Sequence, residues 1–207
     1  MFDLLVATTN SGKLTEIKAF LKHLPLHIIS LNDLHDPPVI AEDGQSFEEN
    51  ALKKARTLAE WSGYRTLADD SGLEVDALGG RPGILSARFS GPEAGDDAGN
   101  NSKLLEELRD ICEEKRTARF VCVLALCLPR SRGGKQCTVR GSCEGIIGFA
   151  AKGKTGFGYD PLFFYPPLGK TFGEIGQQTK ITVSHRGKAL KTLVEVLPAC
   201  FDPVEKP

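Results

Sequence analysis

The hydrophobic pattern at the start of the chain alternates between strand-like and helix-like segments. Residues 3–8 form a short apolar run that is typical of a buried strand. Apolar residues then recur at helical spacing: Leu14, Ile17, Leu21 and Leu24. Asn10 or Ser11 is available as the helix cap, and residues 26–31 return to a strand-like run. The opening of the chain therefore predicts a strand–helix–strand unit.

The middle of the chain predicts two further helices separated by a short strand. Ser46 and Glu49 stand at capping-box spacing at the start of the first helix. Its apolar face contains Phe47, Ala51, Ala55, Leu58 and Ala59. We expect a short strand at residues 66–68. The next helix carries Leu104, Leu105, Leu108, Ile111 and Cys112.

The C-terminal part predicts a hairpin followed by a helix. Residues 117–129 and 136–148 are expected to form adjacent strands, joined by the turn "RSRGGK". The last helix is expected to begin at Ser184, as its cap, and to end at Pro198. Alternating strands and helices followed by a hairpin favour one α/β domain with a mixed central sheet flanked by helices.

Composition narrows the classes of partner. The 207 residues contain 26 Lys and Arg against 27 Asp and Glu, a formal net charge of -1. This balance gives no electrostatic case for a nucleic-acid polymer or an anionic membrane. The chain has no signal-peptide pattern and no apolar run of membrane-spanning length. Its six cysteines form no C-x-x-C pair, so we expect reduced thiols and a cytoplasmic protein.

Residues 8–13, between the first strand and the first helix, are a candidate anion-binding loop. The first N–H groups of a helix lack intrahelical acceptors and lie at the positive end of the helix dipole. Side-chain donors are added by Thr8, Thr9 and Asn10. Lys13 adds a positive charge one turn into the helix. Ala7 and Leu14 exclude a Walker loop, and an ordinary capped helix with an exposed lysine remains the alternative.

Two consecutive acids, Asp69 and Asp70, follow the strand expected at residues 66–68. Neighbouring side chains of an extended chain point to opposite faces, so the two carboxylates should have separate tasks. One could hold a metal ion or activate water while the other braces the loop. The alternative is a solvated turn, because Asp and the following Ser71 and Gly72 are also common turn residues.

Further acids precede the helix that begins at Ser46. Mg²⁺ takes one or two carboxylates and leaves its other positions to water and phosphate oxygens, and Glu42 with Asp70 would form such a set. Acids at a helix N-terminus also complement the helix dipole, and that interpretation suits Asp43 better than Glu42.

Two later segments carry candidate groups for a base or a phosphate. In "TGFGYDPLFF", Phe157 could stack on a base, Gly158 would permit close backbone approach, and Asp160 could accept hydrogen bonds. An aromatic-rich strand start is the alternative. His185 and Arg186 stand in the first turn of the last helix, where cations oppose the dipole; a ligand carbonyl or phosphate would explain them, and a surface position is the alternative.

Together these segments resemble the inosine triphosphate pyrophosphatase, or Ham1, family. The similar segments are "TTNSGK", "EDGQSFEENALKKA", "ADDSGLEVDALGGRPGILSARFSG", "GFGYDPLFF" and "SHRGKAL". They occur in the order of the family and span residues 8–190. A departure lies before Lys180, where "GQQTK" lacks the acids that often precede this lysine in the family.

The resemblance implies Mg²⁺-dependent hydrolysis of the deaminated purine nucleotides ITP, dITP and XTP to the monophosphate and pyrophosphate. It also implies one domain over residues 1–207, elongated and two-lobed with a central cleft, that forms a homodimer. It makes Asp70 the catalytic acid and Glu42 with Asp70 the metal ligands. The implied triphosphate-binding residues are Thr8, Thr9, Asn10, Ser11, Gly12 and Lys13, with Lys54 and Ser71 also on the substrate side. The implied nucleoside pocket contains Phe157, Gly158, Tyr159, Asp160, Lys180, His185 and Arg186.

Base selection is expected at the purine 6-position. Hypoxanthine and xanthine carry a carbonyl there, which Arg186 or a backbone N–H could meet. Adenine would place a donor against a donor and leave buried groups unpaired. Two other functions remain open: a Maf-like pyrophosphatase for pyrimidine or methylated nucleotides, and a nucleotide-binding regulatory module without turnover.

Overall fold

The first strand is the parallel partner of two others. The computed structural model describes residues 2–91 and 96–200. Strand β1 (Phe2–Ala7) pairs in parallel with β2 (Leu26–Ser30) and with β3 (Arg65–Val75). Helix α1 (Ser11–Leu21) connects β1 to β2, so the expected strand–helix–strand unit is confirmed.

The sheet is mixed, as predicted. Seven strands of the described chain follow the order β2-β1-β3-β4-β5-β6-β7. The remaining strands are β4 (Thr117–Cys127), β5 (Gln136–Ile147), β6 (Phe163–Tyr165) and β7 (Lys170–Thr171). Strand β6 is antiparallel to both β5 and β7. The predicted hairpin is β4–β5, closed near its turn by the Leu128 N–H, which donates to the Lys135 carbonyl at 2.8 Å.

The helices begin where polar caps stand. The other helices are α2 (Phe47–Ser62), α3 (Asp97–Glu107), α4 (Gln177–Val183) and α5 (His185–Cys200). Asn10 caps α1 by accepting from the Lys13 N–H at 2.9 Å, and Ser46 caps α2 by accepting from the Glu49 N–H at 3.1 Å. Both starts were expected from the side chains that stand there. None of the helices in residues 2–91 and 96–200 is long and apolar enough to cross a membrane.

Three expected boundaries were wrong. Strand β3 continues through the two consecutive acids to Val75, because cationic side chains satisfy them, as described below. Helix α3 ends at Glu107, so Ile111 and Cys112 lie beyond it, although Leu104 and Leu108 are buried as the pattern predicted. Helix α5 continues to Cys200 and does not end at Pro198.

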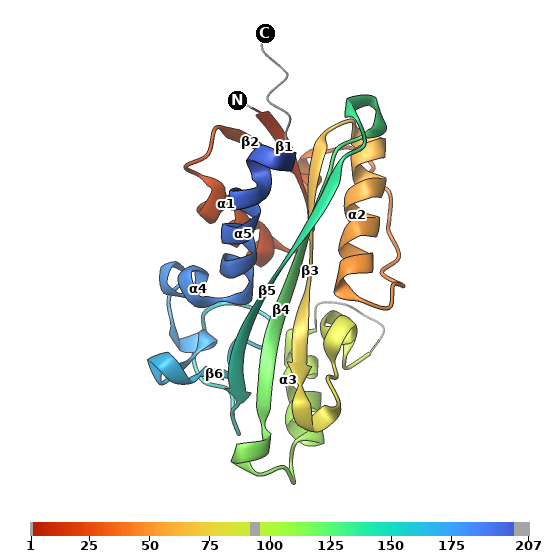
Figure 1. The fold of residues 1–207 in the computed structure, drawn as a ribbon. Helices are drawn as coiled ribbons and strands as arrows, with labels where there is room; N and C mark the ends of the chain where they lie inside the picture. Colours follow the sequence, from red (N-terminus) through yellow and green to blue (C-terminus); the bar gives the residue numbers. More distant parts are fainter. Residues whose placement is uncertain (1, 92–95, 201–207) are drawn as a thin grey trace. The chain divides into compact units, whose positions relative to one another are not determined.

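The chain divides into two compact units. The described residues of the first unit are 2–70, 122–141 and 186–200, and those of the second are 71–91, 96–121 and 142–185. In the first unit, α1 and α5 lie on one side of the strands and α2 on the other (Figure 1). Its core is mostly aliphatic and includes Leu5, Ile17, Leu21, Leu67 and Leu124.

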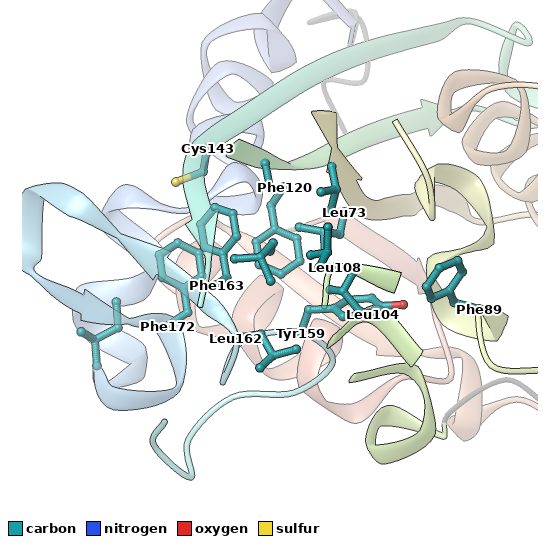
Figure 2. Packing of buried hydrophobic residues seen from close by; sticks show 14 residues of the cluster. Leu73, Phe89, Leu104, Leu108, Phe120, Cys143, Tyr159, Leu162, Phe163 and Phe172 are labelled. Carbon is teal, nitrogen blue, oxygen red and sulfur yellow. The ribbon is translucent and has the colours of Figure 1, made fainter. Parts of the chain in front are cut away.

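The core of the second unit is rich in aromatic rings (Figure 2). The Phe120 and Phe163 ring centroids are 4.5 Å apart, and those of Phe163 and Phe172 are 4.9 Å apart, both pairs tilted. Leu104 and Leu108 bring α3 into the same cluster. Tilted aromatic pairs at these distances add to the energy of apolar burial. The cluster therefore fixes α3 against the strands of this unit.

Candidate functional site

The loop between β1 and α1 is ordered by its own side chains. The Asn10 N–H donates to Thr8 Oγ1 at 3.1 Å, and Asn10 in turn caps the helix. Thr8 is buried, whereas Thr9, Asn10 and Ser11 are exposed and Gly12 is half-buried. The first N–H groups of a helix have no intrahelical acceptors. The cap binds the Lys13 N–H, so the N–H groups of Ser11 and Gly12 are left for another acceptor.

Lys13 forms an ion pair within the first unit. Its Nζ lies 2.7 Å from Asp69 Oδ1, and the lysine side chain is 17% exposed. A half-buried ammonium group with a fixed carboxylate partner is held in one place at the start of α1. The alternative of an ordinary exposed lysine does not describe this residue.

Asp69 is the centre of a buried charge cluster. Besides Lys13, it accepts from Arg186 Nε at 2.8 Å and from the Cys122 thiol, whose Sγ lies 3.3 Å from Oδ2. Burial alone would raise the pKa of this carboxyl, but Arg186 and Lys13 hold its pKa well below the ordinary range. Asp69 is therefore an anion that structures its surroundings.

Arg186 is enclosed by acids. It is 1% exposed, and its Nη1 donates to Glu16 on α1 while its Nε and Nη2 face the two oxygens of Asp69. Burial opposes the positive charge, but Asp69 and Glu16 raise the pKa of the guanidinium well above its usual value. The residue thus joins α5, α1 and β3 inside the first unit, and a surface position is excluded.

Sequence reasoning missed two members of this cluster, Glu16 and Cys122. Glu16 stands three residues after Lys13, so the two share a face of α1, and this spacing was a usable signal. Cys122 lies within an apolar run of β4, where nothing in the sequence separates it from core residues. Its role follows only from its contact with Asp69.

Asp70 belongs to a separate set of charges. Lys54 Nζ lies 3.3 Å from Asp70 Oδ1, 2.6 Å from Glu42 Oε1 and 2.9 Å from the Asp69 carbonyl oxygen. Thus the neighbouring acids of β3 have different cations as partners, as strand alternation predicted. Burial raises the pKa of Asp70, more than Lys54 and Lys13 lower it. A carboxylate with a raised pKa is a better proton acceptor than an ordinary one.

Within the Glu42–Lys54–Asp70 set, the two carboxylates are the candidate ligands of a divalent cation. Asp70 Oδ2 is buried without a hydrogen-bond partner in the part of the chain that the structure describes. Over the same residues, no group of three or more His, Cys, Asp or Glu side chains could hold a metal ion. Glu42 and Asp70 both lie beside Lys54 Nζ. A pair of carboxylates is a ligand set that Mg²⁺ accepts when water and phosphate supply its other ligands.

The second unit holds another set of expected site residues. Lys180 Nζ lies 2.6 Å from Asp160 Oδ2 and 4.7 Å from the centroid of the Phe157 ring. The same Asp160 oxygen accepts from the Phe157 N–H at 2.9 Å. Asp160 and Lys180 are both buried, and the ring of Phe157 is half-buried. One carboxylate thus fixes both the backbone below the ring and the cation beside it.

Other predicted residues occupy core positions. Tyr159 is buried, and this burial raises the pKa of its hydroxyl. The hydroxyl donates to the Ser86 carbonyl at 2.8 Å. The His185 ring stacks on Phe120, with centroids 4.7 Å apart and planes at 17°. Ser71 is half-buried on β3 directly after Asp70. His185 belongs to the second unit although Arg186, the next residue, belongs to the first.

The structure thus gathers the predicted residues into separate groups. The first unit contains the Lys13–Asp69–Arg186 group and the Glu42–Lys54–Asp70 group, and the second contains the Phe157–Asp160–Lys180 group. Each side-chain nitrogen of Arg186 faces a carboxylate of the first unit. Its place among the nucleoside-side residues stays a prediction.

Known proteins resemble the chain over nearly its whole length. A model of the Ham1 family matches residues 4–196. The dITP/XTP pyrophosphatase of Geobacter sulfurreducens is 52% identical over 197 residues, which cover 95% of this chain and 97% of that protein. The dITP/XTP pyrophosphatase of an Exiguobacterium strain is 51% identical over 196 residues, 94% of this chain and 97% of that protein. The solved structure of a HAM1 protein from Coxiella burnetii has a TM-score of 0.85 at 39% identity and covers 96% of this chain and 100% of that one.

Proposed function

The chain belongs to the Ham1 family, and from this premise we propose that it is a hydrolase of deaminated purine nucleoside triphosphates. ITP, dITP and XTP would be its substrates, and the monophosphate and pyrophosphate its products. The relatives named dITP/XTP pyrophosphatase support this substrate class. Such an enzyme would remove these nucleotides before polymerases use them.

The observation that supports the proposal is that Asp69 and Asp70 have different partners and opposite shifts in pKa. Asp69 is saturated by cationic partners and keeps its charge. Asp70 is buried, has a raised pKa and retains an oxygen without a partner. Of these two acids, Asp70 therefore has the properties of a group that accepts a proton during a reaction.

In the proposed reaction, water attacks the α-phosphorus. Asp70 orients this water and takes one of its protons, the new oxygen–phosphorus bond forms, and the bond from the α-phosphorus to the bridging oxygen breaks. That oxygen leaves with the β- and γ-phosphates as pyrophosphate. Lys54 and Lys13 lie near enough to Asp70 to influence its pKa, and both would offset negative charge on the phosphates.

We propose Glu42 and Asp70 as the ligands of Mg²⁺. When bound, the ion would supply further neutralisation of the phosphate oxygens. The exposed and half-buried side chains of the β1–α1 loop, with its free helix N-terminal N–H groups, would hold the phosphate tail.

We assign the nucleoside to the Phe157–Asp160–Lys180 group. The half-buried Phe157 ring offers a surface for stacking, and Lys180 and Asp160 offer a donor and an acceptor. For the purine 6-carbonyl, a backbone N–H is the better of the two donors expected from the sequence, because the nitrogens of Arg186 face Asp69 and Glu16. Arg186 would then act by holding Asp69.

One assay tests the proposed function. Pyrophosphate release is measured for ITP, dITP, XTP, GTP, ATP, dTTP and UTP, with Mg²⁺ and with excess EDTA. We expect release from the first three nucleotides and only with Mg²⁺. Turnover of dTTP or UTP in their place would favour the Maf-like alternative, and ITP binding without release would favour the regulatory module.

We also propose that the protein acts in the cytoplasm as a homodimer. The two relatives are nucleotide pyrophosphatases by name, and a nucleotide pool is a cytoplasmic substrate. Light scattering coupled to size-exclusion chromatography measures the mass directly. A mass of one chain at working concentrations would contradict the dimer.

A further inference from the structure

Gly158 is held from helix α3 by both of its backbone polar groups. Its N–H donates to Asp97 Oδ2 at 2.7 Å, and its carbonyl accepts from Asn101 Nδ2 at 3.0 Å. All three residues belong to the second unit. Two side chains of one helix therefore bind a single residue of a distant segment. Neither Asp97 nor Asn101 was among the residues singled out from the sequence.

The spacing of the two side chains explains how one helix can do this. Asp97 and Asn101 stand four residues apart, so they lie one above the other on the same face of α3. Asp97 supplies an acceptor and Asn101 a donor, which match the N–H and the carbonyl of Gly158. The bond to the Asp97 carboxylate has the short length expected of a charge-assisted hydrogen bond.

Helix α3 is itself firmly placed. Asp96 caps it by accepting from the Gly99 N–H at 2.9 Å. Asn100 accepts from the Ser90 N–H at 2.7 Å and donates to the Ala87 carbonyl at 3.3 Å. Leu104 is fully buried in the aromatic core. The helix can therefore serve as a fixed support for a loop that it contacts.

Gly158 stands in the sequence between Phe157 and Asp160, two of the residues assigned to the nucleoside. Gly158 has a φ of 61°, in the left-handed region that favours glycine, and it directly follows Phe157. Two residues later, Asp160 binds the Phe157 N–H and Lys180. At Gly156, also with positive φ, an added Cβ would come within 2.0 Å of Asp160 Oδ2. A displacement of Gly158 would thus move the Phe157 ring relative to the Lys180–Asp160 pair.

We infer that Asp97 and Asn101 are positioning residues that determine base selection by fixing Gly158, and through it the Phe157 ring. This inference rests on the proposed function, since it concerns the residues to which the nucleoside is assigned there. Neither side chain needs to touch the substrate. Selection among purines depends on where a few polar groups stand against the base, so a looser loop should discriminate less.

The test compares two neighbouring acids of α3. Asp97→Ala removes the contact with Gly158, whereas Asp96→Ala removes the helix cap and leaves that contact in place. We expect Asp97→Ala to lower kcat/KM for ITP about tenfold, mostly through a higher KM, as loss of a hydrogen bond to a charged group implies. The ratio of kcat/KM for ITP to that for ATP should fall about threefold or more, because adenine lacks the 6-carbonyl. Asp96→Ala should lower the melting temperature but keep the wild-type ratio.

Two further variants make the result decisive. Asp97→Asn keeps an acceptor at the same place and should restore most of the ratio, and Asn101→Ala should lower the ratio in the same direction as Asp97→Ala. If the wild-type protein hydrolyses ITP and folded Asp97→Ala keeps the wild-type ratio, this inference alone is overturned. The same ratio in Asn101→Ala decides the matter where Asp97→Ala does not fold. A wild-type protein that releases pyrophosphate from no purine triphosphate would overturn the proposed function as well.

Discussion

Arg186 of the first unit and Lys180 of the second are both buried cations, but their surroundings differ. In the first unit, Arg186 is placed between two carboxylates, Asp69 and Glu16, that come from a strand and a helix. In the second, Lys180 has the carboxylate of Asp160 and the rings of Phe157 and Phe172, at 4.7 and 5.7 Å from its Nζ. Arg186 is thus surrounded by two carboxylates, whereas Lys180 has one carboxylate and two aromatic rings beside it.

This difference suits the roles proposed for the two groups. A group that must keep phosphates and a reacting acid in place gains from several fixed charges, because removing any one leaves another buried and unpaired. A group that selects a base gains from flat apolar surfaces beside a few polar atoms. We therefore expect mutations in the first group to change mainly turnover and stability, and mutations in the second group to change mainly substrate affinity.

The largest expected effect separates the two acids of β3. Asp70→Asn should lower kcat by about 10²–10⁴-fold, because the amide cannot accept the proton from water. The melting temperature should stay close to that of the wild type, since Lys54 keeps its contact with Glu42. Steady-state kinetics with ITP and a thermal melt measure both. Near-normal kcat in the folded variant would refute the proposed role of Asp70.

A second substitution breaks the charge cluster of the first unit. Arg186→Leu leaves Asp69 and Glu16 buried without this partner and should reduce the free energy of unfolding by about 3–5 kcal/mol. Urea denaturation followed by circular dichroism measures the change. Arg130→Ala is the control, since that side chain is 92% exposed and should change stability by at most about 0.5 kcal/mol. Equal stability of the two variants would show that the cluster contributes little.

A third substitution makes the matching change in the second unit. Lys180→Met removes one partner of Asp160 but keeps an unbranched chain beside Phe157, so the loss of stability should be about 3 kcal/mol, below that of Arg186→Leu. The KM for ITP should rise more than kcat falls. Lys170→Met, at an exposed position of β7, is the control. A fall in kcat with unchanged KM would contradict the contrast between the units.

The smallest expected effect concerns the thiol beside Asp69. Cys122→Ala removes a weak donor and should cost about 1 kcal/mol of stability, while Cys122→Ser retains a donor and should differ less from the wild type. Chemical denaturation of both variants checks this order. A serine variant no more stable than the alanine variant would show that the sulfur packs without donating.

Much of the fold could be predicted because its signals are local. Asn10 and Ser46 cap the helices that they were expected to cap, since a capping side chain acts within three residues. The strand–helix–strand opening and the hairpin followed from continuous apolar runs. The length of β3 could not be predicted, because Asp and Gly are depleted in strands and the cations that satisfy Asp69 and Asp70 come from other parts of the chain.

The candidate site was predicted in its members more than in its pairings. The sequence indicated that Asp69 and Asp70 have separate tasks, and their different partners agree with this. The sequence contained no local sign that Glu16 would meet Arg186, because 170 positions separate them and only the packing of α1 and α5 brings them together. The hydrogen bonds of Asp97 and Asn101 to Gly158 could not be predicted either, since they depend on where α3 lies.

The signs along the cluster alternate from Glu16 to Arg186, Asp69 and Lys13, so its formal charges sum to zero. A single substitution that changes one of these charges leaves a net charge in the protein interior, whereas two complementary changes restore the balance. We therefore expect these four charged residues to be replaced in pairs of opposite charge during evolution, because a single replacement would leave a buried net charge and be selected against.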